Sequence, residues 1–304
     1  MRFVLHDHQG KGARLGRELR AAGWKEVPGG AADLLLIDHD VPGFHRQVIE
    51  AHRANGAKVV LYPHGAMPLV SWDGIFEPSG LVDLTLTPAD GQAVVLHRYG
   101  YPGPVAVGGW SYCDLRPFQP VSREMPVKVL FAPFHPTNEG LHAPAKDANA
   151  RAFESLLQVP GVTLIVRHGD RQLEHSGLWE VPGVIYHAMD RELGGALLDI
   201  EYADLVVASG TPGYLAVALG KPTVFFGQEV HPWDTVQGEV KYAEHWEAYR
   251  DLVRFPFDLD DGPAGEVLAE AGRTDAGVRG WREDFIGEAL DGSRFVKMME
   301  QVCV

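Results

Sequence analysis

The residues best suited to chemistry stand between two apolar segments in the second half of the chain. These residues are Ser209, Gly210 and Thr211. They follow the run Leu205–Ala208, which predicts a buried strand, and precede Tyr214–Leu219, which predicts a helix. A helix that begins on such a turn presents backbone N–H groups, hydroxyls and the positive end of its dipole to an anion such as a diphosphate. The alternative is an ordinary helix cap with Pro212 at the first helical position.

Two cationic candidates follow the predicted strand Thr163–Val166. Arg167 and His168 could neutralise phosphate oxygens, because guanidinium and imidazolium groups donate charge-assisted hydrogen bonds. Neighbours in a strand point to opposite faces, so we do not expect both side chains in one site. We expect His168 to face the ligand.

His64 is the candidate general base. It stands between Pro63 and Gly65, just after the predicted strand Lys58–Tyr62, where its side chain is expected to be exposed. The reference pKa of histidine lies near neutrality, which suits removal of a proton from a hydroxyl nucleophile. The alternative is a turn histidine that hydrogen-bonds to the backbone.

Other polar residues follow other predicted strands, at the edge where ligands collect in open α/β sheets. The further candidates for donor or acceptor contacts are Asp7, Lys11, His135, His231 and Asp234. No metal site is expected, because strand alternation sends neighbours in the His6-Asp7-His8 sequence to opposite sides.

The elements that must position these residues alternate between strands and helices, which predicts a parallel sheet covered by helices. In the first half, strands are expected at Phe3–His6, Leu34–Ile37 and Lys58–Tyr62, with helices at Ala13–Ala22 and His45–Ala54. Shorter apolar runs at Leu81–Leu86, Ala93–Leu96 and Val105–Val107 are expected to complete the sheet. The predicted fold class is therefore α/β.

The same alternation restarts after a proline-rich segment. Residues 115–126 carry Pro117, Pro120 and Pro126, which break regular structure and predict a linker between a domain at 1–114 and a domain at 127–304. In the second domain, strands are expected at Val127–Ala132, Thr163–Val166, Val184–Tyr186, Leu205–Ala208 and Thr223–Phe226. Helices are expected at Asn149–Leu157, Leu193–Tyr202, Tyr214–Leu219, Tyr242–Leu252, Gly265–Ala271, Val278–Ala289 and Arg294–Val302.

Composition limits the classes of partner. A chain of 304 residues, 45% hydrophobic and 22% charged, can form two globular domains. The net charge of −14 disfavours a general electrostatic grip on nucleic acid or an anionic membrane, since such partners are usually held by a surplus of Lys and Arg. A strip of Lys11, Arg14, Arg17 and Arg20 along one helical face leaves nucleic acid as an alternative, although a solvated surface is the favoured interpretation.

Localisation follows from what the sequence lacks. No apolar stretch approaches the ~20 residues that span a bilayer, so no integral membrane segment is expected. The start of the chain does not read as a signal peptide. Two widely spaced cysteines fit a reducing compartment, and we expect a cytoplasmic protein.

With these residues in view, the chain resembles the two-domain glycosyltransferases of the GT-B fold, and within them the CDP-glycerol glycerophosphotransferases (teichoic acid polymerases). It is more weakly similar to the nonhydrolysing UDP-N-acetylglucosamine 2-epimerases. The motifs that carry the resemblance are His64-Gly65 with Pro68, Phe131-Ala132-Pro133, Val166-Arg167-His168, Ser209-Gly210 with Ala216 and Gly220-Lys221-Pro222, and Asp291-Gly292-Ser293. The resemblance implies two Rossmann-like domains facing a central cleft, with the acceptor on the N-terminal side and the donor nucleotide on the C-terminal domain.

The chain departs from both families at two places. Leu215 stands near the position of an acidic residue, and in the epimerases and many GT-B transferases that carboxylate binds a ribose. Tyr62-Pro63 replaces the tryptophan of the polymerase motif. The first departure leaves the nucleoside of the donor open.

The resemblance implies metal-independent transfer of a glycosyl or polyol-phosphate group from a nucleotide-activated donor to an acceptor hydroxyl. His64 would take the proton of the acceptor, and the Ser209 turn with His168 would hold the diphosphate. No cofactor is expected besides the donor itself, a nucleotide-sugar or nucleotide-polyol. The alternatives are a nucleotide-sugar epimerase, a non-catalytic nucleotide or glycan binder, and a viral glycosyltransferase acting on modified DNA bases.

Overall fold

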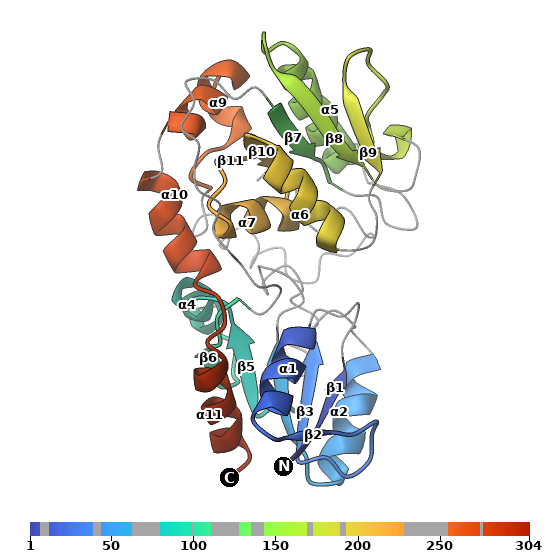
Figure 1. Ribbon diagram of the computed structural model, residues 1–304, viewed down its shortest axis with the longest axis vertical. Helices are drawn as coiled ribbons and strands as arrows, with labels where there is room; N and C mark the ends of the chain where they lie inside the picture. The colour runs from blue at the N-terminus through green and yellow to red at the C-terminus, as the bar shows by residue number, and fades with distance from the viewer. Residues whose placement is uncertain are drawn as a thin grey trace. The chain divides into compact units, whose positions relative to one another are not determined.

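The computed structural model describes residues 1–6, 12–38, 44–62, 80–98, 100–110, 128–134, 143–168, 173–188, 193–227, 255–273 and 276–304. The chain divides into two compact units. Unit 1 consists of Met1–Leu115 and Glu283–Val304, and unit 2 of Arg116–Arg282. Each unit is built on a parallel sheet of its own with helices packed against it (Figure 1).

The sheet of unit 1 is parallel and has the strand order β2-β1-β3-β4-β5-β6. Its strands are β1 (Arg2–His6), β2 (Lys25–Glu26), β3 (Leu34–Asp38), β4 (Lys58–Tyr62), β5 (Leu84–Thr87) and β6 (Val105–Val107). All five residues of β3 are buried, as in a central strand covered on both faces. The helices of this unit are α1 (Ala13–Ala21), α2 (Phe44–Ala54), α4 (Asp90–Arg98) and α11 (Gly292–Val302).

The segment Ala93–Leu96 was expected to be a strand, and this prediction was wrong. It lies within α4, where Val95 and Leu96 are buried and Val94 is 63% exposed. Four adjacent apolar residues fit a short strand as well as a helix, so their pattern alone could not separate the two.

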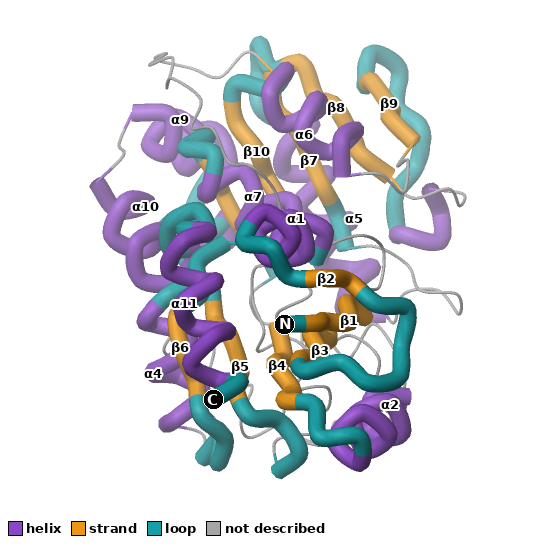
Figure 2. Tube along the Cα trace, turned by 60° about the horizontal axis from the view of Figure 1, so that its bottom comes forward, coloured by secondary structure: helices purple, strands orange, loops and turns teal. Residues whose placement is uncertain are grey.

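The last part of the chain returns to unit 1, whereas the sequence prediction placed all of 127–304 in the second domain. Trp110 N–H donates to Glu288 O at 2.7 Å, and Leu290 N–H donates to Trp110 O at 3.0 Å. Phe295 and Met299 of α11 join the core of unit 1, where α11 packs beside α1 (Figure 2). An apolar helix face does not indicate which of two sheets it will cover. The packing of α11 in unit 1 was therefore not predicted from the sequence. The expected linker, 115–126, lies outside the described residues.

The sheet of unit 2 is also parallel, with the order β11-β10-β7-β8-β9. Its strands are β7 (Lys128–Ala132), β8 (Thr163–His168), β9 (Ile185–Ala188), β10 (Leu205–Ala208) and β11 (Thr223–Phe225). Its helices are α5 (Ala143–Leu157), the short η2 (Leu173–Ser176), α6 (Leu193–Tyr202), α7 (Thr211–Ala218), the short η4 (Leu259–Asp261), α9 (Ala264–Arg273) and α10 (Ala276–Trp281).

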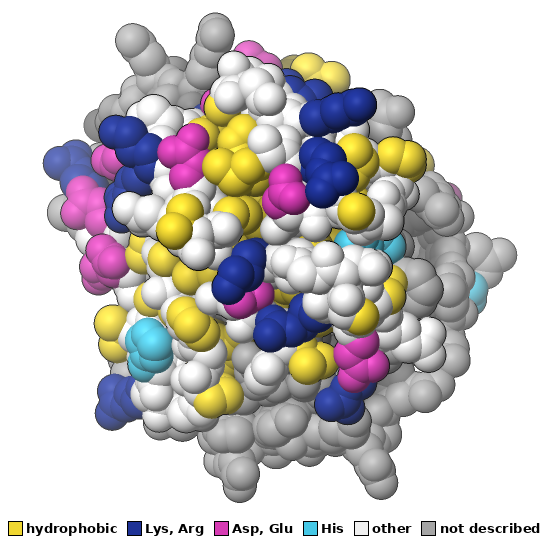
Figure 3. Space-filling view, turned by 90° about the horizontal axis from the view of Figure 1, so that it is seen from below, with side chains coloured by type: hydrophobic (Ala, Val, Ile, Leu, Met, Phe, Trp, Pro, Cys, Tyr) yellow, Lys and Arg dark blue, Asp and Glu magenta, His cyan; other side chains and the backbone are white. Residues whose placement is uncertain are grey.

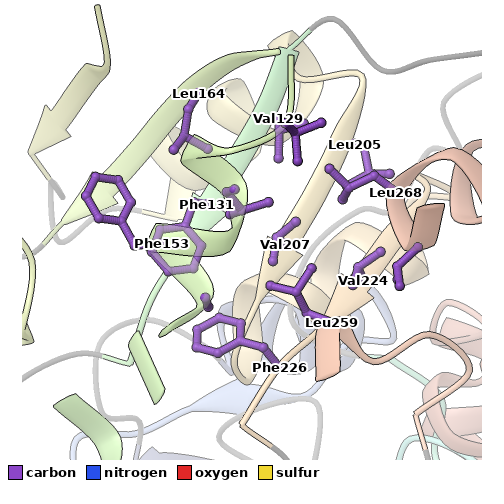
Figure 4. Close-up of a cluster of buried hydrophobic side chains, with 14 of the residues drawn as sticks. Val129, Phe131, Phe153, Leu164, Leu205, Val207, Val224, Phe226, Leu259 and Leu268 are labelled. Atoms are coloured by element: carbon purple, nitrogen blue, oxygen red, sulfur yellow. The ribbon is translucent and has the colours of Figure 1, made fainter. Parts of the chain in front are cut away.

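The two faces of this sheet carry different layers. Figure 4 shows Phe131 and Val207 of the sheet together with Phe153 of α5 and Leu268 of α9, so α5 and α9 cover one face. On the other face, α7 approaches closely because Gly213 lacks a side chain. A Cβ there would lie 2.6 Å from the ring of Phe225.

The predicted helix Val278–Ala289 is interrupted. α10 ends at Trp281 and is followed by a π-helical turn, η5 (Arg282–Ile286), that crosses the boundary between the units. The predicted helix Tyr242–Leu252 lies outside the described residues.

Candidate functional site

The carboxyl edge of the unit 2 sheet brings the turn at Ser209 and the end of β8 to the same side. β10 pairs with β7, and β7 with β8, all in parallel. The N–H of Ser209 donates to Ala132 O at 3.2 Å, which ties the turn after β10 to the end of β7. One strand separates β10 from β8, so their ends lie roughly 10 Å apart, twice the strand spacing. A nucleoside diphosphate can extend over that span.

The turn before α7 requires glycine. Gly210 has φ 93° and ψ −142°, a backbone conformation that side chains disfavour. A Cβ at Gly210 would meet no atom of the described residues within 4 Å. The first helical bonds run to Gly210 O from the N–H groups of Gly213 and Tyr214, at 2.9 and 3.2 Å. The N–H groups of Gly210 and Thr211 therefore lie ahead of the helix's own hydrogen bonds.

The hydroxyl of Ser209 is buried and, within the described part of the chain, forms no hydrogen bond. It does not cap α7, since the N-cap residue is Gly210 and no side chain accepts a bond there. A buried polar group left without a partner costs about 1–3 kcal/mol. An ordinary cap, the alternative interpretation of this turn, therefore does not account for Ser209. An anion at the helix N-terminus would give its hydroxyl an acceptor.

His168 ends β8 beside an immobilised aromatic ring. Its imidazole lies edge-on to Tyr186 of β9, with ring centroids 6.3 Å apart. Tyr186 Oη donates to Trp179 O and accepts from Val181 N–H, both at 2.9 Å. Burial raises the pKa of Tyr186 above its usual value. Two hydrogen bonds thus hold the Tyr186 ring in place where it contacts His168.

Arg167 lies on the opposite face of β8, as strand alternation requires. Its side chain is buried and pairs with Asp199 of α6. The other carboxylate oxygen of Asp199 lies 2.9 Å from His187 Nδ1. This carboxylate was not predicted from the sequence. A buried guanidinium needs such a partner, so the burial of Arg167 is explained without a phosphate.

The remaining candidates were proposed as a general base and as donor or acceptor contacts. His64, Asp7, Lys11, His135, His231 and Asp234 lie outside the described residues, as does the side chain of Thr211. Their proposed roles stay predictions.

Unit 1, taken by itself, has one buried pair that was not predicted from the sequence. Asp38 ends β3 and Tyr62 ends β4, and the two residues are paired in register with about 1% of each exposed. A Cβ on Gly12 would lie 2.5 Å from Tyr62 Oη, so the start of α1 closes against this ring. The sequence pattern that could have indicated this pair is a carboxylate, Asp38, placed next to the apolar residues of β3.

Two arginines of the basic strip on α1 bind other residues of the same unit. Arg14 Nη2 donates to Leu290 O at 2.8 Å, and Arg20 pairs with Glu26. Figure 3 shows basic and acidic side chains interspersed on one face of the molecule. The interpretation of the strip as a solvated surface stays a prediction.

Metal sites and membrane spans were sought among the described residues. They contain no group of three or more His, Cys, Asp or Glu side chains arranged to hold a metal ion. None of their helices combines the length and hydrophobicity needed to cross a bilayer.

No protein-family model matches the sequence, and a search of curated proteins finds no match either. Solved structures do match, over nearly the whole chain. MnaA of S. aureus in complex with UDP has a TM-score of 0.59 at 11% identity, with 99% of this chain and 96% of that one covered. The spinosyn rhamnosyltransferase SpnG with thymidine diphosphate has a TM-score of 0.56 at 14% identity, covering 99% and 100%. The wall teichoic acid polymerase TagF has a TM-score of 0.54 at 10% identity, covering 99% and 87%.

The chain has the GT-B fold. The expected fold class, two Rossmann-like α/β domains of the GT-B type, is thus confirmed. In this GT-B chain, Ser209 and His168 belong to the second Rossmann-like unit. At identities of 10–14% the similarity concerns the fold, and the chemistry must come from the site itself.

Proposed function

We propose that this protein transfers a glycosyl or polyol-phosphate group from a nucleotide-activated donor to an acceptor hydroxyl. The observation that carries the proposal is the turn at Ser209 and Gly210. Among the described residues, its buried hydroxyl has no hydrogen-bond partner and no atom lies within 4 Å of a Cβ built on the glycine. Both features lie at the N-terminus of α7, where the helix dipole favours an anion.

Two of the similar structures support a diphosphate in particular. MnaA was solved with UDP and SpnG with thymidine diphosphate, and SpnG and TagF are named as a rhamnosyltransferase and a polymerase. In this chain the donor's diphosphate would lie on Ser209, Gly210 and Thr211, with His168 reaching it from β8. Arg167 is left out of this site because Asp199 engages it.

The reaction places negative charge on the departing nucleotide. The α7 dipole, the Ser209 hydroxyl and the His168 imidazole would stabilise that charge, so the proposed mechanism uses no metal ion. His64 would accept the proton of the acceptor hydroxyl as its oxygen attacks the donor.

A thermal-shift screen tests the donor site. UDP, CDP, GDP, ADP and dTDP are added to the wild type, to Ser209→Ala and to His168→Ala, because a ligand of the folded state raises the melting temperature. Ser155→Ala is the matched control, since Ser155 is exposed on α5 in the same unit. We expect one diphosphate to stabilise the wild type and Ser155→Ala but not the two site variants. If no diphosphate raises the melting temperature at millimolar concentration, the proposed function is wrong.

Product analysis separates transfer from the alternatives. Incubation of the matching activated donor with candidate acceptors should yield a product that contains the acceptor. A donor that changes only in configuration would indicate an epimerase, and a donor that binds unchanged would indicate a binder.

A further inference from the structure

Asn149 of α5 is a buried amide that uses both its oxygen and its nitrogen. Its exposed fraction is 0%. Oδ1 accepts a hydrogen bond from Phe134 N–H at 2.9 Å. Nδ2 donates to Phe134 O at 3.1 Å and to Ser176 O at 2.8 Å. One side chain therefore satisfies three backbone groups that would be costly to leave buried and unpaired.

Two of these backbone groups belong to Phe134, which leaves the sheet next to the candidate donor site. Phe134 stands two residues after Ala132, the end of β7. The carbonyl of Ala132 accepts the N–H of Ser209. We call these three hydrogen bonds of Asn149 the clamp. The clamp therefore fixes the end of β7, the strand end to which the Ser209 turn is hydrogen-bonded.

The third group, Ser176 O, lies in the segment that follows β8. Ser176 is the last residue of η2, and His168 is the last residue of β8. Gly177, with φ 75°, comes so close to α5 that a Cβ would lie 2.7 Å from Lys146 O. Asn149 and the α5 backbone thus hold the segment through which the chain returns after His168.

The ring of Phe134 extends the clamp to the end of β11. It packs edge-on against Phe226, with ring centroids 5.6 Å apart. A Cβ on Gly227 would lie 2.6 Å from the Phe134 ring and 3.5 Å from Ala148 Cβ. The first turns of α5 therefore contact the chain beyond the ends of three strands, β7 and β8, which are neighbours, and β11, which is separated from β7 by β10.

We propose that Asn149 is a positioning residue for the donor site, fixing these three segments so that the Ser209 turn and His168 keep a constant separation. This inference rests on the proposed function. A leucine of similar volume at position 149 would fill the space but leave the Phe134 and Ser176 backbone groups without partners. The effect should appear in the geometry of the binding edge, because the hydrogen bonds of Asn149 end on Phe134 and Ser176, while the apolar core around Phe131 and Phe153 keeps its contacts.

The experiment compares Asn149→Leu with a core variant of the same helix. Leu156→Ala is the matched control, because Leu156 lies two turns further along α5 and is buried in the apolar core. Amide hydrogen exchange is followed in peptides covering 128–134, 173–188 and 205–227. In Asn149→Leu we expect faster exchange at Phe134, at 173–177 and at 223–227 together. In Leu156→Ala we expect no such selective change.

Gly177→Ala provides a second variant that disturbs only one segment, in case Asn149→Leu fails to fold. Its strained φ and its contact with Lys146 O should accelerate exchange at 173–178 alone. For the diphosphate identified by the thermal-shift screen, affinity should fall about tenfold in Asn149→Leu and less in Gly177→Ala, with Leu156→Ala unchanged.

Each outcome decides between the alternatives. Equal amide exchange at Phe134, 173–177 and 223–227 in Asn149→Leu and Leu156→Ala would refute the claim that Asn149 holds these three segments. Selective exchange with unchanged nucleotide affinity would overturn the positioning role. A wild type that binds none of the diphosphates would refute the proposed function, while the exchange comparison alone would still test whether Asn149 holds the three segments.

Discussion

Tyr214 of α7 stacks on Trp281, the last residue of α10, with ring centroids 5.9 Å apart and planes inclined by 20°. Phe225 and Phe255 complete the cluster, and their rings stack with centroids 4.2 Å apart. The helix that begins at the proposed diphosphate turn is therefore anchored, one turn later, in an aromatic layer that closes unit 2.

Replacement of Trp281 should destabilise unit 2. Trp281 is 7% exposed, and truncation of a buried tryptophan costs about 3–5 kcal/mol. We expect Trp281→Ala to lower the urea midpoint of unit 2 far more than Trp179→Ala, because Trp179 is 40% exposed. Equal midpoints for the two variants would show that the cluster contributes little.

The Arg167–Asp199 pair should contribute to the stability of unit 2 and not to the affinity for the donor nucleotide. Arg167→Leu removes the guanidinium partner of Asp199 and leaves this carboxylate with His187, and breaking such a buried ion pair costs about 3–5 kcal/mol. The double variant Arg167→Leu/Asp199→Leu should recover much of that loss in a double-mutant cycle measured by urea unfolding. If Arg167→Leu is as stable as the wild type but binds the nucleotide more weakly, Arg167 belongs to the donor site after all.

His52 should make stability depend on pH. Burial, and to a lesser degree the charge of His6, lowers the pKa of His52 from its usual 6.5, and its buried Nδ1 forms no hydrogen bond among the described residues. The unfolded chain therefore binds this proton more readily than the folded protein does. Stability is retained above about pH 6.5 and falls as the pH drops from there through the lower folded value.

The check compares urea midpoints at pH 7.5 and pH 5.5. His52→Gln should show a smaller fall in midpoint than the wild type, whereas His97→Gln, at an exposed position on α4, should behave like the wild type. A fall of the same size in His52→Gln would assign the pH dependence to other groups.

Lys221 should stabilise α6 from the amino edge of the sheet. Its Nζ donates to Glu201 O at 3.0 Å and to Ala203 O at 2.6 Å, where α6 ends. The positive charge complements the helix dipole, and we expect Lys221→Met to cost about 1–2 kcal/mol in thermal or urea unfolding. Nucleotide affinity should not change, because Lys221 precedes β11 while the Ser209 turn follows β10. A loss of affinity without a loss of stability would contradict this assignment.

Strands were predicted from the sequence more accurately than the layers that cover them. The runs Lys58–Tyr62, Val105–Val107 and Leu205–Ala208 match β4, β6 and β10 in both bounds, because short apolar runs between turn residues are typical of strands in parallel sheets. The return of α11 to unit 1 depends on contacts between distant segments, which no local pattern encodes.

The parts of the site that depend on the type of a single residue could be predicted from the sequence. The parts that depend on which residues contact one another in the fold could not. The Ser209-Gly210 turn could be identified because glycine and small polar residues have a local meaning at a helix start. The partner of Arg167 could not be identified, since Asp199 lies 32 positions away. Asn149 was expected only as the first residue of a helix, and its three backbone contacts appear only when α5 is placed on the sheet.

Titration calorimetry with a nucleoside diphosphate and its matching monophosphate tests the central claim most directly. The claim assigns the terminal phosphate of the diphosphate to the Ser209 turn. We expect one site in the wild type, with the diphosphate bound at least about tenfold more tightly than the monophosphate, and loss of that difference in Ser209→Ala. Equal affinities for the two nucleotides in the wild type, or an undiminished difference in Ser209→Ala, would contradict the account.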